Sequence, residues 1–167
     1  MYDELTAVDI RKMQEELEYI HTVLLPQLGA EVKRTREYGD LSENAEYKVA
    51  KQERNRARSR ARYLEAMIRT ARVIKVESRE GEVSLFDYVT YLHEERQVTK
   101  RVQIVTTLRQ DALEGYLSKE SPLGQALLGK HEGDRVQVVV NPTRSYYVTI
   151  CKIEKGEDNE DLPIAPF

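Results

Sequence analysis

The chain has 167 residues, of which 40% are hydrophobic and 33% are charged, and its formal net charge is −3. A chain of this length and apolar content can bury one core of ordinary size or two small ones, which excludes a disordered protein. It contains no run of 18 or more apolar residues, and its first residues, MYDELTAVDIRK, lack a basic segment followed by an apolar one. We therefore expect a cytoplasmic protein without a membrane span or a secretion signal.

The charge is distributed unevenly along the chain. Between Lys48 and Arg72 there are nine Lys or Arg residues and only two acids, Glu53 and Glu65. Five acidic residues cluster after Ile153. The basic middle segment favours a polyanionic partner, which the net charge alone would not indicate.

The first half of the chain opens with an amphipathic helix. Its apolar residues recur at alternating steps of three and four, with acidic residues between them. They are Ile10, Met13, Leu17, Ile20 and Leu24. Pro26 interrupts the pattern, because proline removes a helical hydrogen bond and costs about 3 kcal/mol unless the helix bends. We expect a bend there, after which the apolar positions continue at Leu28 and Val32.

A second seam with the same spacing follows. It consists of Tyr47, Ala50, Arg54, Ala57, Ala61, Leu64, Ile68 and Ala71. Its alanines would let two helices approach closely. The break between the seams lies at Gly39, which can end a helix in the left-handed conformation, and Asp40 or Ser42 can cap the next helix. The pattern predicts an antiparallel αα-hairpin in residues 1–75, whose second helix of thirty-odd residues spans roughly 45 Å.

After Val73 the pattern alternates with a period of two, which predicts strands. The expected strands are 73–76, 86–92, 98–105, 136–140 and 146–153. Between them, Ser121 and Pro122 begin a short helix as its cap and first residue, and Gly129 follows its end. The sequence thus predicts an α+β fold, in which the coiled-coil hairpin precedes a mostly antiparallel β domain with one short helix in residues 76–155. Residues 156–167 are expected to form an acidic, flexible tail.

Cysteine and histidine form no cluster in the sequence. The single cysteine, Cys151, lies in an alternating apolar stretch, so we expect a small buried residue without a disulfide. His21, His93 and His131 are far apart, and each is expected to be an ordinary surface or core histidine.

Two segments resemble those of the bacterial Gre transcript-cleavage factors. They are RTREYGDLSENAEYKVAKQE, at the expected hairpin tip, and SPLGQALLGKHEGDRVQVVV in the second half. The resemblance extends over nearly the whole chain. It implies that the C-terminal domain is FKBP-like and docks on bacterial RNA polymerase, and that the hairpin enters the secondary channel of the polymerase. The chain departs from the family pattern at Asn141–Ser145, where many relatives have a glycine-rich hairpin, and in its acidic tail.

The resemblance also implies a role for the hairpin tip. The tip acids of the family match Asp40 and Glu43, which would be the catalytic residues and would help to hold a second Mg²⁺ within the polymerase active centre. Asn44 and Ser42 would support the tip. The polymerase then cleaves the 3′ segment of its own backtracked RNA, so the factor is not itself an enzyme and holds no cofactor tightly. Mg²⁺ is often bound by only one or two protein carboxylates, which suits this acidic pair.

The acidic pair also has a purely structural interpretation. Asp40 and Glu43 have the spacing of a capping box, and both carboxylates would favour the positive end of a helix dipole. The residues alone favour capping, whereas the resemblance favours metal binding. The two interpretations are compatible, because a capped tip also fixes the carboxylates.

An alternating run of five arginines begins at Arg54. Steps of two residues rotate by about 200° around a helix, so Arg54 and Arg58 share one flank. Acidic partners are scarce within this helix, and an RNA phosphate chain is a natural counterion. Nearer the tip, Lys51, together with Lys48 and Arg36, matches basic positions that approach the RNA 3′ segment in the family. The alternative is a solvated helix face.

Ser121, Pro122, Leu123 and Gly129 resemble the family surface that meets the polymerase rim, and the alternative is an ordinary helix cap with core residues. The expected partners are RNA polymerase and the nascent RNA, with no membrane, and the chain is expected to be a monomer. Two other functions stay open: a secondary-channel inhibitor that does not stimulate cleavage, and a basic coiled coil that binds RNA by charge. An isomerase activity finds no support, because a fold does not carry an activity.

Overall fold

The computed structural model describes residues 3–39 and 44–166, which divide into two compact units. The first unit consists mainly of Ile10–Ala71, and the second of Glu4–Asp9 together with Arg72–Pro166. The segment 4–9 was expected in the hairpin domain, but it groups with the second unit. One reason is that β1 (Glu4–Leu5) pairs in parallel with β2 (Arg72–Val73).

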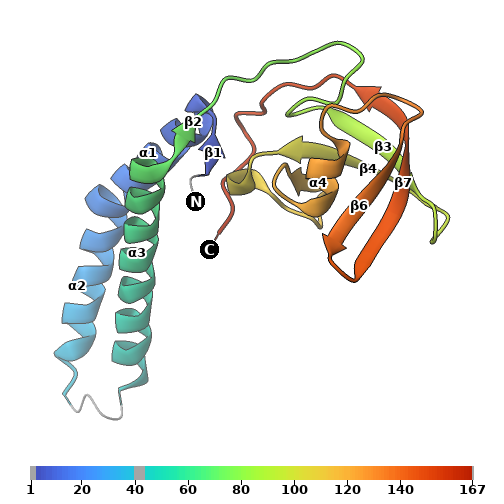
Figure 1. Cartoon of the computed structure of the whole chain (residues 1–167). Helices are drawn as coiled ribbons and strands as arrows, with labels where there is room; N and C mark the ends of the chain where they lie inside the picture. The colour runs from blue at the N-terminus through green and yellow to red at the C-terminus, as the bar shows by residue number, and fades with distance from the viewer. Residues whose placement is uncertain (1–2, 40–43, 167) are drawn as a thin grey trace. The chain divides into compact units, whose positions relative to one another are not determined.

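The first unit is an antiparallel helical hairpin, as the sequence predicts (Figure 1). Its first arm contains α1 (Ala7–Tyr19), the π-helical segment η1 (Ile20–Leu24) and α2 (Leu25–Arg36), and α3 (Ala45–Thr70) returns along it. Within the described ranges, neither these helices nor any other is long and apolar enough to cross a membrane.

The buried faces of the hairpin are those that the apolar spacing predicts. Met13, Ile20 and Val32 are buried on the first arm. The residues buried on α3 are Ala50, Ala57, Ala61 and Leu64. The 26 residues of α3 span about 39 Å. The helix is shorter than expected because it begins at Ala45.

The disturbance expected at Pro26 takes the form of a change in hydrogen bonding. The Leu25 amide donates to the carbonyl of Ile20, five residues earlier, and Pro26 then occupies the first turn of α2. A proline at this position lacks only an N–H that the first turn of a helix does not need. The π-helical segment therefore lets the first arm continue past the proline.

The second unit contains a five-stranded sheet in the order β5-β4-β3-β7-β6. Its strands are β3 (Tyr88–His93), β4 (Val98–Val105), β5 (Tyr116–Ser118), β6 (Arg135–Asn141) and β7 (Arg144–Glu154). All neighbours pair antiparallel except β4 and β5, which are parallel. The α+β class and the mostly antiparallel sheet are confirmed. The strand expected at 73–76 is not part of this sheet, and β5 takes the fifth place.

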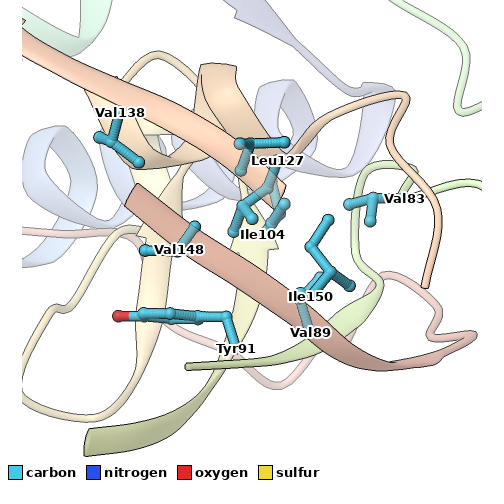
Figure 2. Packing of buried hydrophobic residues seen from close by; sticks show 9 residues of the cluster. Val83, Val89, Tyr91, Ile104, Leu127, Val138, Val148 and Ile150 are labelled. Atoms are coloured by element: carbon cyan, nitrogen blue, oxygen red, sulfur yellow. The ribbon is translucent and has the colours of Figure 1, made fainter. Parts of the chain in front are cut away.

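The core of the second unit lies between the sheet and α4 (Pro122–Leu127), which packs against β6. Figure 2 shows Leu127 of α4 beside Ile104 of β4 and Ile150 of β7, with Val138 and Val148 nearby. These side chains come from alternate strand positions, so the period of two in the sequence identifies the inward face.

The expected burial of Cys151 is wrong. The pairing of β3 with β7 shifts between Thr90 and Tyr91, whose partners are Lys152 and Ile150. Cys151 is therefore the extra residue of a β-bulge, and it is exposed. Cys151 points away from the face that buries Val148 and Ile150, and after the bulge the inward side chain is Ile153, a shift that a period-two pattern does not reveal.

Residues after Gly156 make specific contacts within the second unit. Asp158 and Asn159 bind Arg109, and the Ala165 amide donates to the carbonyl of Leu108 at 2.6 Å. The flexibility expected for residues 156–167 stays a prediction, and these contacts favour a segment that is held in place.

Candidate functional site

Asn44 joins the two helix ends at the hairpin tip. Its Oδ1 accepts a hydrogen bond from the Tyr47 amide at 3.0 Å, which makes it the N-cap of α3. Its Nδ2 donates to the carbonyl of Thr35 at 2.7 Å, near the end of α2. One side chain thus caps one helix and adds a hydrogen bond to a carbonyl in the last turn of the other.

Asp40, Ser42 and Glu43 lie outside the described residues. The structure nevertheless defines where α3 begins, because Ala45 is its first residue and Asn44 is its cap. The expected capping box, with Asp40 at the cap and Glu43 at the third helical position, falls outside the described residues and stays a prediction. Within the described residues, the cap of α3 is Asn44.

Thr35 belongs to the tip but was missed in the sequence. Its side chain is buried, and its Oγ1 donates to the carbonyl of Glu31 at 2.9 Å and lies 3.1 Å from that of Val32. Because this hydroxyl bonds back to its own helix, its burial leaves no unsatisfied group. Thr35 lies three residues after Val32, in step with the apolar seam, and this spacing could have indicated that its side chain is buried.

Arg34 connects α2 to the first turn of α3. Its Nη2 lies 2.5 Å from Glu31 Oε1 and 4.0 Å from Glu46 Oε2, and its guanidinium lies 5.3 Å from the centroid of the Tyr38 ring. The hydrogen bond from Arg34 holds the pKa of the Glu31 carboxyl below its usual range. Glu31 and Tyr38 lie three and four residues from Arg34, spacings at which helical side chains meet, so these contacts could be read from the sequence. Arg34 is engaged in contacts within the hairpin.

Side chains around Arg34 also border an open cavity of about 350 Å³. Its lining residues are Glu31, Arg34, Ala45, Glu46, Val49, Ala50 and Glu53. Three of them are acids and only one is a cation, so the cavity is not suited to a phosphate group.

The five cations expected near RNA differ in exposure. Arg36, Lys48, Lys51 and Arg58 are exposed, whereas Arg54 is half-buried on the helix seam. The Nε of Arg54 is buried and has no hydrogen-bond partner among the described residues. Within those same residues, none of the five cations forms an ion pair.

Two other arginines of the alternating run have partners in the hairpin. Arg60 binds Glu16 of α1 through Nε–Oε1 at 2.6 Å and Nη2–Oε2 at 3.0 Å. Arg62 donates from Nη2 to Ser59 Oγ at 3.1 Å. Counting acids within α3 alone missed Glu16, because this partner comes from the other arm. Arg60 therefore has an acidic partner, but its side chain is only 12% exposed and does not lie on a solvated face.

The residues expected at the polymerase rim lie at the two ends of α4. Ser121 Oγ accepts from the Gly124 amide at 3.0 Å, so Ser121 is the helix cap. Leu123 packs against the apolar core. Pro122 and Gly129 are exposed. Gly129 has a φ of 77°, the left-handed conformation that suits a residue past the end of a helix.

The described residues contain no group of three or more His, Cys, Asp or Glu side chains that could hold a metal ion. The histidines have structural contacts instead. His21 lies 3.2 Å from Glu65, and His93 stacks on Tyr146 with ring centroids 4.5 Å apart. These contacts agree with the ordinary roles expected from the sequence.

Both units match one family of transcription factors. Residues 4–73 match the family model described as "Transcription elongation factor, N-terminal", and residues 78–155 match that of "Transcription elongation factor, GreA/GreB, C-term". The chain therefore belongs to the GreA/GreB family and is a transcription elongation factor.

Curated relatives have similar lengths. Transcription elongation factor GreA of Mesomycoplasma hyopneumoniae (strain 7448) is 37% identical over 149 residues, which cover 89% of this chain and 92% of the relative. The corresponding factor of Streptococcus gordonii is 38% identical over 153 residues, which cover 90% and 94%. Among solved structures, the GreA factor homolog Gfh1 of Thermus thermophilus aligns with 93% of this chain and 100% of its own, at 24% identity and a TM-score of 0.42.

Proposed function

We propose that this elongation factor binds bacterial RNA polymerase through the secondary channel and stimulates the polymerase's own cleavage of backtracked RNA. The observation that carries the proposal is the cap of α3. Asn44 provides both the capping acceptor and the link to α2, so Asp40 and Glu43 are not needed to start the helix. Membership of the GreA/GreB family supports the same role for the motif GDLSEN.

Asp40 and Glu43 would serve as carboxylate ligands of Mg²⁺ at the polymerase active centre. Carboxylate oxygens are the donors that this ion prefers, and phosphate oxygens and water commonly complete its coordination. When bound at a scissile phosphodiester, Mg²⁺ activates the attacking water and stabilises the leaving oxygen. The chain contributes placement, because hydrogen bonds anchor the residue that directly follows Glu43.

The basic residues would guide the RNA. The candidates are Arg36, Lys48, Lys51, Arg54 and Arg58, which lack acidic partners among the described residues. Cations without acidic partners can bind phosphates without first losing an ion pair. On the second unit, the exposed Pro122 and Gly129 at the ends of α4 would contribute to the contact with the polymerase rim.

RNA cleavage in a backtracked elongation complex tests the proposal. The complex is stalled with labelled RNA, and the release of the 3′ fragment is followed over time in Mg²⁺ with and without the factor. We expect the factor to accelerate cleavage and to restore elongation after nucleotides are added. Slower elongation without cleavage would favour the inhibitor, and salt-sensitive binding to bare RNA without any effect on polymerase would favour the RNA-binding coiled coil.

A further inference from the structure

A fully buried arginine in the second unit binds residues from both ends of the chain. Arg109 belongs to η2 (Thr107–Arg109), and its side chain is 0% exposed. Its Nε donates to Asp9 Oδ1 at 2.7 Å, and the Asp9 side chain is also 0% exposed. Its Nη2 donates to Asp158 Oδ2 at 2.9 Å, and its Nη1 donates to the carbonyl of Asn159 at 2.8 Å.

The tail supplies the acceptors for both terminal nitrogens of this guanidinium. Asp158 Oδ1 also lies 2.5 Å from Arg109 Nη1, at ion-pair distance although outside hydrogen-bond geometry. A buried charge is tolerated when its hydrogen bonds are made, and it is costly when a partner is removed. Without the tail, Arg109 would keep only its bond to Asp9 among these contacts.

The start and the end of the tail are fixed as well. The Gly156 amide donates to Asp87 Oδ1 at 3.2 Å, and a Cβ added at Gly156 would lie 2.1 Å from the carbonyl oxygen of Phe86. The tail therefore begins where only glycine fits. Near its other end, the Ala165 amide donates to the carbonyl of Leu108, next to Arg109.

The tail also reaches the N-terminal cap of α1. Asp9 Oδ2 accepts from the Thr6 amide at 3.0 Å, and the Asp9 amide donates to Thr6 Oγ1 at 3.3 Å, which is a reciprocal capping arrangement. Thr6 Oγ1 lies 3.3 Å from Asp158 Oδ2. Asp158 thus contacts both Arg109 and the residue that caps α1.

We infer that residues 156–166 form an intramolecular strap, which completes the binding of Arg109 and thereby holds the Thr6–Asp9 cap in its folded conformation. The matched C-terminal family region ends at residue 155, so the strap lies beyond both matched regions. This inference concerns the second unit and does not depend on whether the hairpin tip stimulates cleavage.

Hydrogen exchange of the full chain tests the strap, with Asp158→Asn as the variant and Glu157→Gln as the matched control. Each substitution removes one negative charge from the tail, but Glu157 is exposed. Asp158→Asn should raise amide exchange in segments 4–10 and 105–110 by on the order of tenfold, because a charge-assisted hydrogen bond to a buried group is weakened. Glu157→Gln should leave both segments unchanged.

A second comparison, in an Arg109→Met background, distinguishes loss of the strap from a general loss of stability. In an Arg109→Met background the buried charge is absent, so adding Asp158→Asn should change exchange in these segments by less than about twofold. Equal exchange in Asp158→Asn and the wild type would overturn the strap. So would an effect of Asp158→Asn that persists in full in the Arg109→Met background.

Discussion

At the scale of single residues, Asn44 explains why an amide stands at the start of α3. The two hydrogen bonds of its side chain need one acceptor and one donor, which serve the Tyr47 amide and the Thr35 carbonyl. Aspartate and serine cap helices as well, but a carboxylate has no donor for the second bond. Asn44 is therefore suited to join both arms of the hairpin.

Substitutions of Asn44 should separate these two bonds. Asn44→Ala loses the cap and leaves the Thr35 carbonyl without this partner, so the free energy of unfolding should fall by about 1–3 kcal/mol. Asn44→Asp keeps a capping acceptor and should lose less. Urea unfolding of the three proteins measures the order, and an Asn44→Ala variant as stable as the wild type would contradict the capping role.

At the scale of elements, the place of Cys151 on β7 predicts how reactive its thiol is. Cys151 follows the buried Ile150 and points to the opposite face of the strand, so the thiol is exposed. A chromogenic disulfide reagent should therefore titrate one thiol in the native protein, at a rate within about tenfold of that in the unfolded chain. Cys151→Ser should abolish the signal without lowering the melting temperature. Reaction only after unfolding would show that Cys151 is buried.

The short strand β1 should contribute a pH-dependent stability through Glu4. Lys119 donates a hydrogen bond to Glu4 Oε2 and lowers the pKa of the Glu4 carboxyl. A carboxyl group with a lowered pKa stabilises the fold at pH values above its unfolded pKa, and this contribution is lost as the pH falls through the folded pKa. Glu4→Gln should therefore lower the melting temperature at pH 7, and its difference from the wild type should shrink as the pH falls through the lowered folded pKa. A difference that does not change with pH would mean that the charge of Glu4 is not the cause.

Elements with long periodic patterns were predictable from the sequence, and short ones were not. The steps of three and four identified the hairpin seam through Met13 and Leu64, both fully buried. The strands β1 and β5 have two and three residues, which is too few to show alternation. Asp40, Ser42 and Asn44 all had capping side chains, so local chemistry did not identify the cap.

The candidate site was predictable only in part for a similar reason. The motif GDLSEN indicated the tip through resemblance, but Thr35 and Glu16 act through contacts between the two arms. Such contacts depend on how the helices pair, which no short stretch of sequence contains. The same holds for Arg109, whose partners lie 100 and 49 positions away.

At the scale of the whole molecule, the two units have separate features that suit separate tasks. The hairpin carries the motif GDLSEN between its two arms, basic residues without acidic partners in the described ranges, and a capped start of α3 at Asn44. The second unit has a closed apolar core and exposed residues at both ends of α4. In the proposed function, the second unit docks on the polymerase and the hairpin delivers Asp40 and Glu43.

The most direct test of this account is RNA cleavage in a backtracked complex with Asp40→Asn and Glu43→Gln, in proteins shown to fold and to bind polymerase. Glu37→Gln is the matched control, because it removes the charge of an exposed carboxylate at the C-cap of α2. Because the metal needs the lost charges, both tip variants should slow cleavage by on the order of 100-fold, and higher Mg²⁺ should restore part of the rate. Glu37→Gln should cleave like the wild type. Cleavage at the wild-type rate in both tip variants would contradict the account.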